Sequence, residues 1–275
     1  MTIAILTVPS CSNLRDEHRG TVVVSGSYGG NYNAYNAARG GVRAVVMSDA
    51  NVGKDRAGIH GLDYLERVGI AAATAAADTC HIGDGDDILA HGAVSYVNSI
   101  AASLGCTPGQ SVRDCAVLMK AAVPSHALLP PIAEGGRFVI AAAGGQPRII
   151  CVDTAGMIEP GDVGEIVVTG SHAALPGGKP DRVVCADLLA VFFSDGGIGK
   201  DEAGVARLAD LDRRGMIAAA VSVATAPIGH SREIYRDGVL SRVNAAASRA
   251  GGRAGIRLRD FIRQIGSENP IRHGI

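Results

Sequence analysis

The chain has 275 residues, enough for one large domain or two smaller ones with a substantial core. Hydrophobic residues make up 47% of it and charged residues 19%, a composition that excludes an intrinsically disordered chain. The formal net charge is −1 and there is no long basic run, so nucleic acid is not expected as a partner. The longest apolar runs, such as 70–77, are too short to cross a bilayer, and no membrane association is expected. Six cysteines without a Cys-x-x-Cys pair, and the absence of an export signal, favour a reducing, cytoplasmic location.

An internal duplication dominates the sequence. Residues 21–27 resemble residues 165–171, and residues 47–98 align without a gap with residues 193–244. In the second pair of segments 21 of 52 positions are identical, far more than chance would give. The chain therefore contains two copies of one unit of roughly 100 residues.

Each copy alternates short apolar strands with helix-compatible stretches that end at glycine. In chain order, the first copy has expected strands at 3–8, 22–25, 42–47 and 70–77, with helices at 33–39, around 59–65 and at 86–104. The second copy repeats this order at 148–152, 166–169, 183–193, 205–214, 217–223 and 232–249. Such alternation predicts an α/β fold of two tandem, pseudo-symmetric βαβαβα repeats with mainly parallel sheets covered by helices on both faces.

The predicted domain organisation follows the duplication. The first repeat is expected at 1–105 and the second at 147–252. Between them, residues 106–146 are expected to form a connector with a helix at 111–122 and a hairpin around Gly144-Gly145. Residues 253–275 form a basic tail with a helical pattern from 256 to 265. An alanine-rich, aromatic-poor chain of this kind is also expected to form a homo-oligomer.

Polar residues gather in the loops that follow the strands. Ligands of open parallel sheets bind outside the carboxyl ends of the strands, so these loops are expected to meet at one edge and to bind a small-molecule substrate. A glycine-rich turn after a strand can also present backbone N–H groups to an anion. The expected substrate-binding residues are Gly26, Tyr28, Gly29, Gly30, Asn31, Asn51, His81, Asp84, Ser171, His172, Asp195 and Lys200.

The same loops carry the expected catalytic residues, namely Ser27, Asp49, Lys54, Asp55 and Cys80. In this hypothesis Lys54 activates Ser27 or Cys80, an aspartate orients Lys54, and the backbone amides of Gly29 and Gly30 stabilise an oxyanion. An Asp-Lys-Cys grouping is similar in kind to the triads of cysteine amidohydrolases, and a Ser-Lys pair in each repeat is similar to the arrangement in cyclic-amide hydrolases. The sequence thus favours a hydrolase that acts on an amide or a related carbonyl compound.

Several alternatives remain open at this stage. Ser-Asp and Gly-Lys-Asp recur in both copies, as a purely structural motif would, whereas Cys80 and His81 occur only in the first. Cys80 is also compatible with a small buried core residue. Lys and carboxylates at the edge also suit a lyase or isomerase that transfers protons, or a non-catalytic protein that binds an anion or a phosphate ligand. No cofactor or metal is predicted. A divalent cation is the weaker alternative, at a cluster of acids and histidines that comprises His81, Asp84, Asp86, Asp87 and His91.

Overall fold

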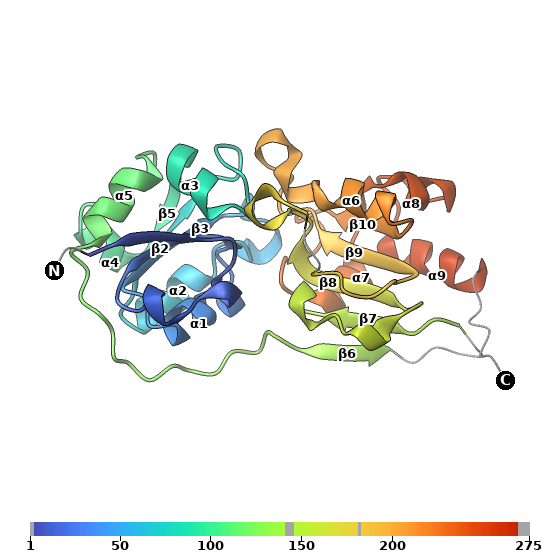
Figure 1. Ribbon diagram of the computed structural model, residues 1–275, viewed down its shortest axis with the longest axis horizontal. Helices are drawn as coiled ribbons and strands as arrows, with labels where there is room; N and C mark the ends of the chain where they lie inside the picture. Colours follow the sequence, from blue (N-terminus) through green and yellow to red (C-terminus); the bar gives the residue numbers. More distant parts are fainter. Residues whose placement is uncertain (1–2, 141–145, 181–182, 269–275) are drawn as a thin grey trace. The chain divides into compact units, whose positions relative to one another are not determined.

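The computed structural model describes residues 3–140, 146–180 and 183–268. The chain divides into two compact units. The first comprises Met1–Ala133, Ala174–Lys179 and Gly197–Gly204, and the second comprises Glu134–Ala173, Pro180–Gly196 and Val205–Ile275. Each unit contains one mainly parallel sheet with helices (Figure 1), which confirms the predicted α/β fold with two repeats.

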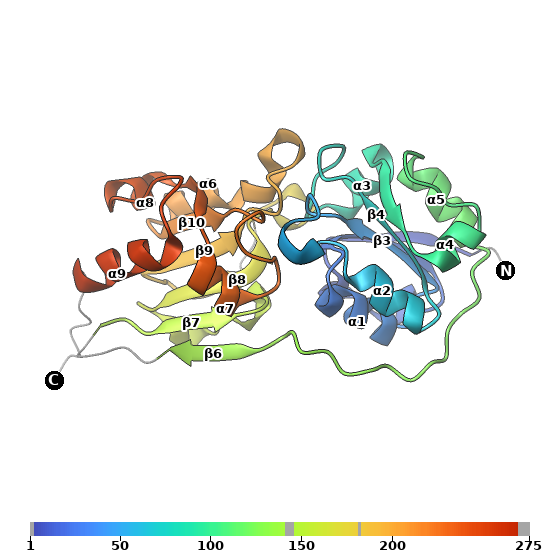
Figure 2. The ribbon, with the colours of Figure 1, turned by 180° about the vertical axis from the view of Figure 1, so that it is seen from behind.

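The first sheet has the strand order β1-β2-β3-β4-β5. Strands β1 to β4 are parallel, and β5 pairs antiparallel with β4. Helices α3, α4 and α5 lie on one face of this sheet and α1 and α2 on the other (Figure 2). Side chains alternate between the two faces, so that Val22 and Val24 pack in the first of these cores and Val23 in the second. The bounds are β1 Ile5–Val8, β2 Val22–Tyr28, α1 Asn31–Arg39, β3 Ala44–Ser48, α2 Gly61–Arg67, β4 Ala71–Ala75, α3 Gly85–His91, β5 Val94–Val97, α4 Ser99–Ser103 and α5 Val112–Met119.

The second sheet has the strand order β11-β10-β9-β8-β7-β6. Strands β7 to β10 are parallel, and the two edge strands β6 and β11 are antiparallel to their neighbours. The predicted turn at Gly144-Gly145 lies outside the described residues, but the strands on either side of it pair antiparallel, as in a hairpin. The bounds are β6 Arg137–Ile140, β7 Ile149–Val152, β8 Ile166–His172, β9 Ala190–Ser194, α6 Arg207–Arg213, β10 Ile217–Val221, α7 Ser231–Asp237, β11 Leu240–Val243, α8 Ala245–Arg249 and α9 Leu258–Glu268.

The single helix predicted at 86–104 is wrong, because the segment forms α3, then β5, then α4. Gly92 leaves the helix with extended backbone, and a Cβ there would lie 2.6 Å from the Ile88 carbonyl oxygen. The Asn98 side chain then caps α4 by accepting from the Ala101 N–H at 3.0 Å. Asn244 makes the equivalent bond to Ala247 at 2.8 Å, and the second copy shows the same helix-strand-helix order. Asn98 and Asn244, which are related by the offset of 146 residues, therefore have the same structural role in the two units.

The repeated arrangement continues beyond residues 105 and 252. Helix α5 begins at Val112 and α9 at Leu258, the same offset of 146 residues that relates the aligned segments. An isolated bridge precedes each helix, Ala93 with Ser111 and Val239 with Arg257. The predicted connector helix and the predicted tail helix are thus equivalent elements of the two repeats. Helix α1, in contrast, has no helical counterpart among the described residues of the second copy, since 173–180 and 183–189 contain only the short 3-10 turn Pro176–Gly178.

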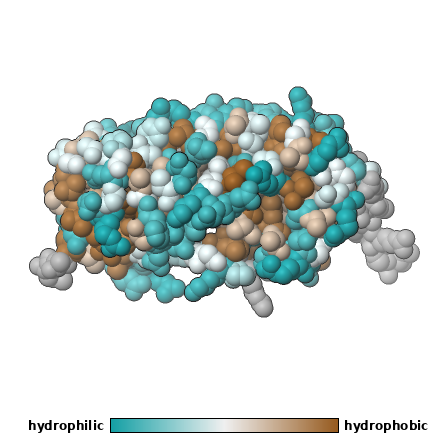
Figure 3. Space-filling view, turned by 90° about the horizontal axis from the view of Figure 1, so that it is seen from above, coloured by the Kyte–Doolittle hydropathy of each residue, from teal (hydrophilic) through white to brown (hydrophobic). Residues whose placement is uncertain are grey.

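The face shown in Figure 3 has hydrophobic residues interspersed with hydrophilic ones. Within the part of the chain that is described, no helix combines the length and the apolar character needed to cross a membrane.

Candidate functional site

The loops after β2, β3 and β4 meet at the carboxyl edge of the first sheet. The Gly83 N–H donates to the Gly26 carbonyl at 2.7 Å, and the Gly29 N–H donates to the Ser48 carbonyl at 2.8 Å. Contact between these loops is so close that a Cβ at Gly26 would lie 2.3 Å from the Gly83 carbonyl carbon. The structure thus brings together loops that are separated by up to about 60 residues in the chain, as the topology of parallel strands requires.

Asp49 joins two of these loops. Its carboxylate is buried, and Oδ1 accepts the N–H of Asn51 at 2.8 Å and the N–H of Ala77 at 3.0 Å. Burial raises the pKa of Asp49. Asp195 makes the equivalent bond in the second repeat, accepting the Val223 N–H at 3.1 Å. The recurrence of this aspartate in both repeats therefore has a structural explanation.

Ser27 and its counterpart Ser171 share a structural role. The Ser27 hydroxyl is buried and accepts the Cys11 N–H at 3.0 Å, and the Ser171 hydroxyl accepts the Ala155 N–H at 2.9 Å. The backbone amide of Gly29 already donates to the Ser48 carbonyl, which leaves it unavailable to an oxyanion. Ser27 and Ser171 therefore each hold the loop that follows the first parallel strand of their own unit.

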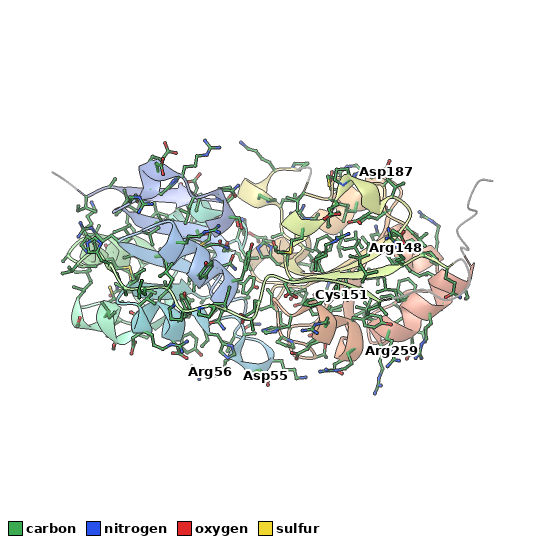
Figure 4. All side chains as sticks on the ribbon, turned by 90° about the horizontal axis from the view of Figure 1, so that it is seen from below. Asp55, Arg56, Arg148, Cys151, Asp187 and Arg259 are labelled. Carbon is green, nitrogen blue, oxygen red and sulfur yellow. The ribbon has the colours of Figure 1, made fainter. Side chains whose placement is uncertain are left out.

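The Gly-Lys-Asp motif lies in a strained loop. Ala50, Asn51, Val52 and Asp55 all have positive φ, with that of Val52 at 63°, an unusual value for a β-branched residue. The ammonium group of Lys54 forms no hydrogen bond or ion pair with any described residue, and Asp55 is exposed and points away from the ribbon (Figure 4). Neither residue contacts Ser27 through a hydrogen bond. The corresponding loop of the second repeat has the same backbone conformation. Positive φ values recur there, 146 residues further along the chain, at Gly196, Gly197, Ile198, Gly199, Asp201 and Glu202.

Cys80 lies beneath this edge. Its side chain is completely buried, and its thiol donates to the Ala76 carbonyl at 3.5 Å. Burial raises the pKa of Cys80 to about 12, partly offset by a hydrogen bond from Thr79 and by the charge of Lys200. A thiol with this pKa is protonated at neutral pH, the opposite of an activated nucleophile.

His81, in contrast, lies in a network of titratable side chains. Its Nε2 is 2.8 Å from Asp201 Oδ2 and its Nδ1 is 3.6 Å from Asp87 Oδ2. The backbone N–H of His81 also donates to Asp87 Oδ1 at 2.7 Å, and Nδ1 of His91 forms a hydrogen bond with Asp87 Oδ2 at 3.0 Å. The bond from His81 lowers the pKa of Asp201. About a third of the His81 side chain is exposed, so that solvent reaches the ring.

Asp201 belongs to the first unit although it comes from the second repeat. Segment Gly197–Gly204 packs on the first unit, where the Lys200 N–H donates to the Ala77 carbonyl at 2.9 Å. Space is tight, since a Cβ at Gly197 would lie 2.4 Å from the Cβ of Asn51. The sequence places both Lys200 and Asp201 in a loop at a strand end, but only Lys200 is among the predicted binding residues. No motif signals the partnership, because it depends on where this segment folds.

The other predicted site residues are found in various roles. Asp84 caps α3 by accepting the N–H groups of Asp86 at 3.0 Å and Asp87 at 3.1 Å, and the Tyr28 carbonyl accepts from the Asn33 side chain at 2.9 Å. In the second unit, burial and the charge of Arg207 lower the pKa of His172 to about 3. Among the described residues, no group of three or more His, Cys, Asp or Glu side chains is arranged to hold a metal ion.

Comparison of the chain with protein-family models, with curated proteins and with solved structures gives no match.

Proposed function

We propose that the protein is a hydrolase of a small-molecule amide or related carbonyl compound, in which His81 acts as the general base on a water molecule. The observation that carries the proposal is the His81 ring between two carboxylates, with Asp201 at 2.8 Å, at the carboxyl edge of the first sheet. A carboxylate that accepts from one ring nitrogen fixes the tautomer and stabilises the imidazolium form when the other nitrogen takes a proton.

The proton path follows from these distances. When Nε2–H donates to Asp201, Nδ1 is the proton acceptor, and its separation of 3.6 Å from Asp87 leaves it outside direct hydrogen-bond distance. A water that donates to Nδ1 loses a proton to His81 as its oxygen attacks the carbonyl carbon. His81 then returns the proton to the leaving nitrogen, so that the C–N bond breaks and a carboxylic acid and an amine are formed.

Two lysines provide positive charge in this proposal. Lys200 is adjacent to Asp201 and its backbone is bonded to the loop after β4, which makes it the candidate for stabilising the oxyanion. Lys54, whose ammonium group is unpaired among the described residues, is the candidate for binding an anionic group of the substrate. Water replaces Ser27 and Cys80 as the nucleophile, because Ser27 anchors a loop and Cys80 is a buried, protonated thiol.

The same network supports a second candidate function. A histidine held by carboxylates also transfers a proton to or from carbon, which is the chemistry of a lyase or isomerase. Hydrolysis incorporates one oxygen atom from solvent into the product, whereas proton transfer incorporates none. Turnover in water enriched in oxygen-18 therefore separates the two functions.

The experiment uses the full-length protein and a panel of linear amides, cyclic amides and cyclic ureides, with mass spectrometry of the products. The wild-type protein should hydrolyse at least one member with one labelled oxygen per turnover. His81→Ala should lower kcat about a hundredfold or more, in line with the usual contribution of a general base. His126→Ala removes an exposed histidine and should leave kcat unchanged. Equal rates in the two variants, or a panel that is not turned over at all, would contradict the proposal.

A further inference from the structure

We infer that a polar pocket on the first unit binds the phosphate group of a small molecule. The pocket has a volume of about 210 Å³ and lies between the loop that follows β1 and the C-terminal half of α1. It shares no residue with the His81 network and goes beyond the proposed hydrolysis. The lining residues that carry the inference are Ser12, Arg15, Asp16, Arg19, Asn36 and Arg39.

The lining of the pocket has an excess of positive charge. Three arginines, Arg15, Arg19 and Arg39, and one acid, Asp16, line the pocket, which gives its lining a net charge of about +2. None of the three arginines forms an ion pair with any residue in the described part of the chain. Arginine presents paired N–H donors that match the oxygens of phosphate, and several guanidinium groups around one pocket suit a tetrahedral anion.

The second repeat shows what the same loop looks like when its charges are balanced. Its two 3-10 turns, Ala155–Met157 and Pro160–Asp162, correspond to Cys11–Asn13 and Asp16–His18 at a constant offset of 144 residues. Glu159 occupies the position of Arg15, and both Glu159 and Asp162 contact Arg137, at 3.6 and 2.6 Å.

The fold therefore tolerates acids at these positions and supplies an internal partner for them. In the first repeat the sign of the charge at the Arg15 position is reversed, and the one acid of the lining, Asp16, forms no ion pair with the three arginines among the described residues. An anionic ligand would supply such a partner.

Asn36 prepares one wall of the pocket. It is 4% exposed, and its Oδ1 accepts from Arg39 Nη2 at 3.0 Å, which holds this guanidinium in place. Its Nδ2 has no hydrogen-bond partner within the described residues. A buried donor without an acceptor is unfavourable, and the described residues supply no acceptor for this one.

The dimensions restrict the ligand. Sites for drug-sized molecules measure roughly 300–1,000 Å³, so this pocket suits a phosphate group and little more. A phosphate monoester carries a charge of about −1.5 to −2 at pH 7, which matches the charge of the lining.

Isothermal titration of the full-length protein with inorganic phosphate, at ionic strength held constant with chloride, tests the inference. Saturable binding to one site per chain is expected. Arg39→Gln, and separately the double variant Arg15→Gln/Arg19→Gln, should weaken it about ten- to a hundredfold, as expected for loss of charge-assisted hydrogen bonds. Arg259→Gln is the matched control, because Arg259 is an exposed arginine on α9 that points away from the ribbon (Figure 4). The affinity of this variant for phosphate should equal that of the wild-type protein.

Circular dichroism and the Tm without phosphate establish that each variant is folded, and Arg39→Lys, which keeps the charge but not the paired donors, should bind with intermediate affinity. Absence of saturable binding in the wild-type protein would overturn the inference, as would equal affinities in Arg39→Gln and Arg259→Gln. Malonate should bind more weakly than phosphate, and equal or tighter binding of malonate would overturn the assignment to phosphate. His81→Ala should leave phosphate binding unchanged, so that failure of the hydrolase proposal and failure of this inference are distinguished.

Discussion

Replacement of Asp49 separates the structural role of the Ser-Asp motif from a catalytic one. Asp49→Ala removes the acceptor of two backbone N–H groups, of which that of Ala77 is buried. A buried donor left without a partner costs about 1–3 kcal/mol, and the more accessible N–H of Asn51 adds less. The free energy of unfolding of the first unit should therefore fall by about 2–4 kcal/mol.

Asp49→Asn keeps an acceptor oxygen and provides the isosteric comparison. Burial raises the pKa of Asp49 above its ordinary value of 3.8, so the folded state favours the protonated carboxyl. The stabilising contribution of this group is present below pH 3.8 and is lost as the pH rises through the raised pKa. Relative to the wild type, Asp49→Asn should consequently become more stable as the pH increases across that range.

The assay is urea unfolding followed by circular dichroism, with hydrogen exchange of the Ala77 amide as a local readout. Asp55→Asn is the matched control, since Asp55 is an exposed carboxylate in the same loop, and asparagine also accepts its positive φ, so that the change should alter stability by less than about 0.5 kcal/mol. Equal and small effects of Asp49→Ala and Asp55→Asn, with unchanged exchange at Ala77, would refute the reasoning.

Three further outcomes are expected. Gly58→Ala should prevent folding or lower the Tm strongly, because an alanine Cβ would lie 2.0 Å from a carbonyl oxygen, whereas Gly161→Ala, with nothing within 4 Å, should be tolerated; circular dichroism and thermal melts compare the two. Iodoacetamide should label the native protein at Cys185 alone, since the other five cysteines are buried, and peptide mapping that finds rapid labelling elsewhere would contradict the packing. The ring resonances of His172 should not titrate between about pH 5 and 8, because its pKa is about 3, and Arg207→Gln should raise that pKa; a midpoint near 6.5 in the wild type would show the environment to be wrong.

The duplication made the fold predictable from the sequence. A short apolar segment by itself is compatible with a strand or a buried helix, but the same segment occurs twice at a constant offset and in the same order. The predicted, mainly parallel α/β sheets are confirmed. The comparison also identified positions that the scaffold needs twice. Asp49 and Asp195, like Asn98 and Asn244, make matching hydrogen bonds in both units.

The prediction of one helix at 86–104 was wrong because three short elements follow one another there with a single hydrophobic pattern. Residues 86–104 read as one helix because apolar residues recur at helical spacing, yet only the packing of Val94–Val97 beside β4 stabilises a strand of four residues there. The break at Gly92 was visible in the sequence, but a single glycine does not distinguish a kink from the end of a helix.

The sequence by itself thus determined the duplication, the α/β class and the edge at which the loops gather, because these depend on local periodicity and on the topology of parallel strands. Only the tertiary structure decided which side chains meet there. His81 and Asp201 are 120 residues apart and come from different repeats, and they pair because segment Gly197–Gly204 packs on the first unit. Spacing along the chain carries no information about such a pairing, since it is the packing of the backbone around Ala77 that brings the carboxylate to the imidazole.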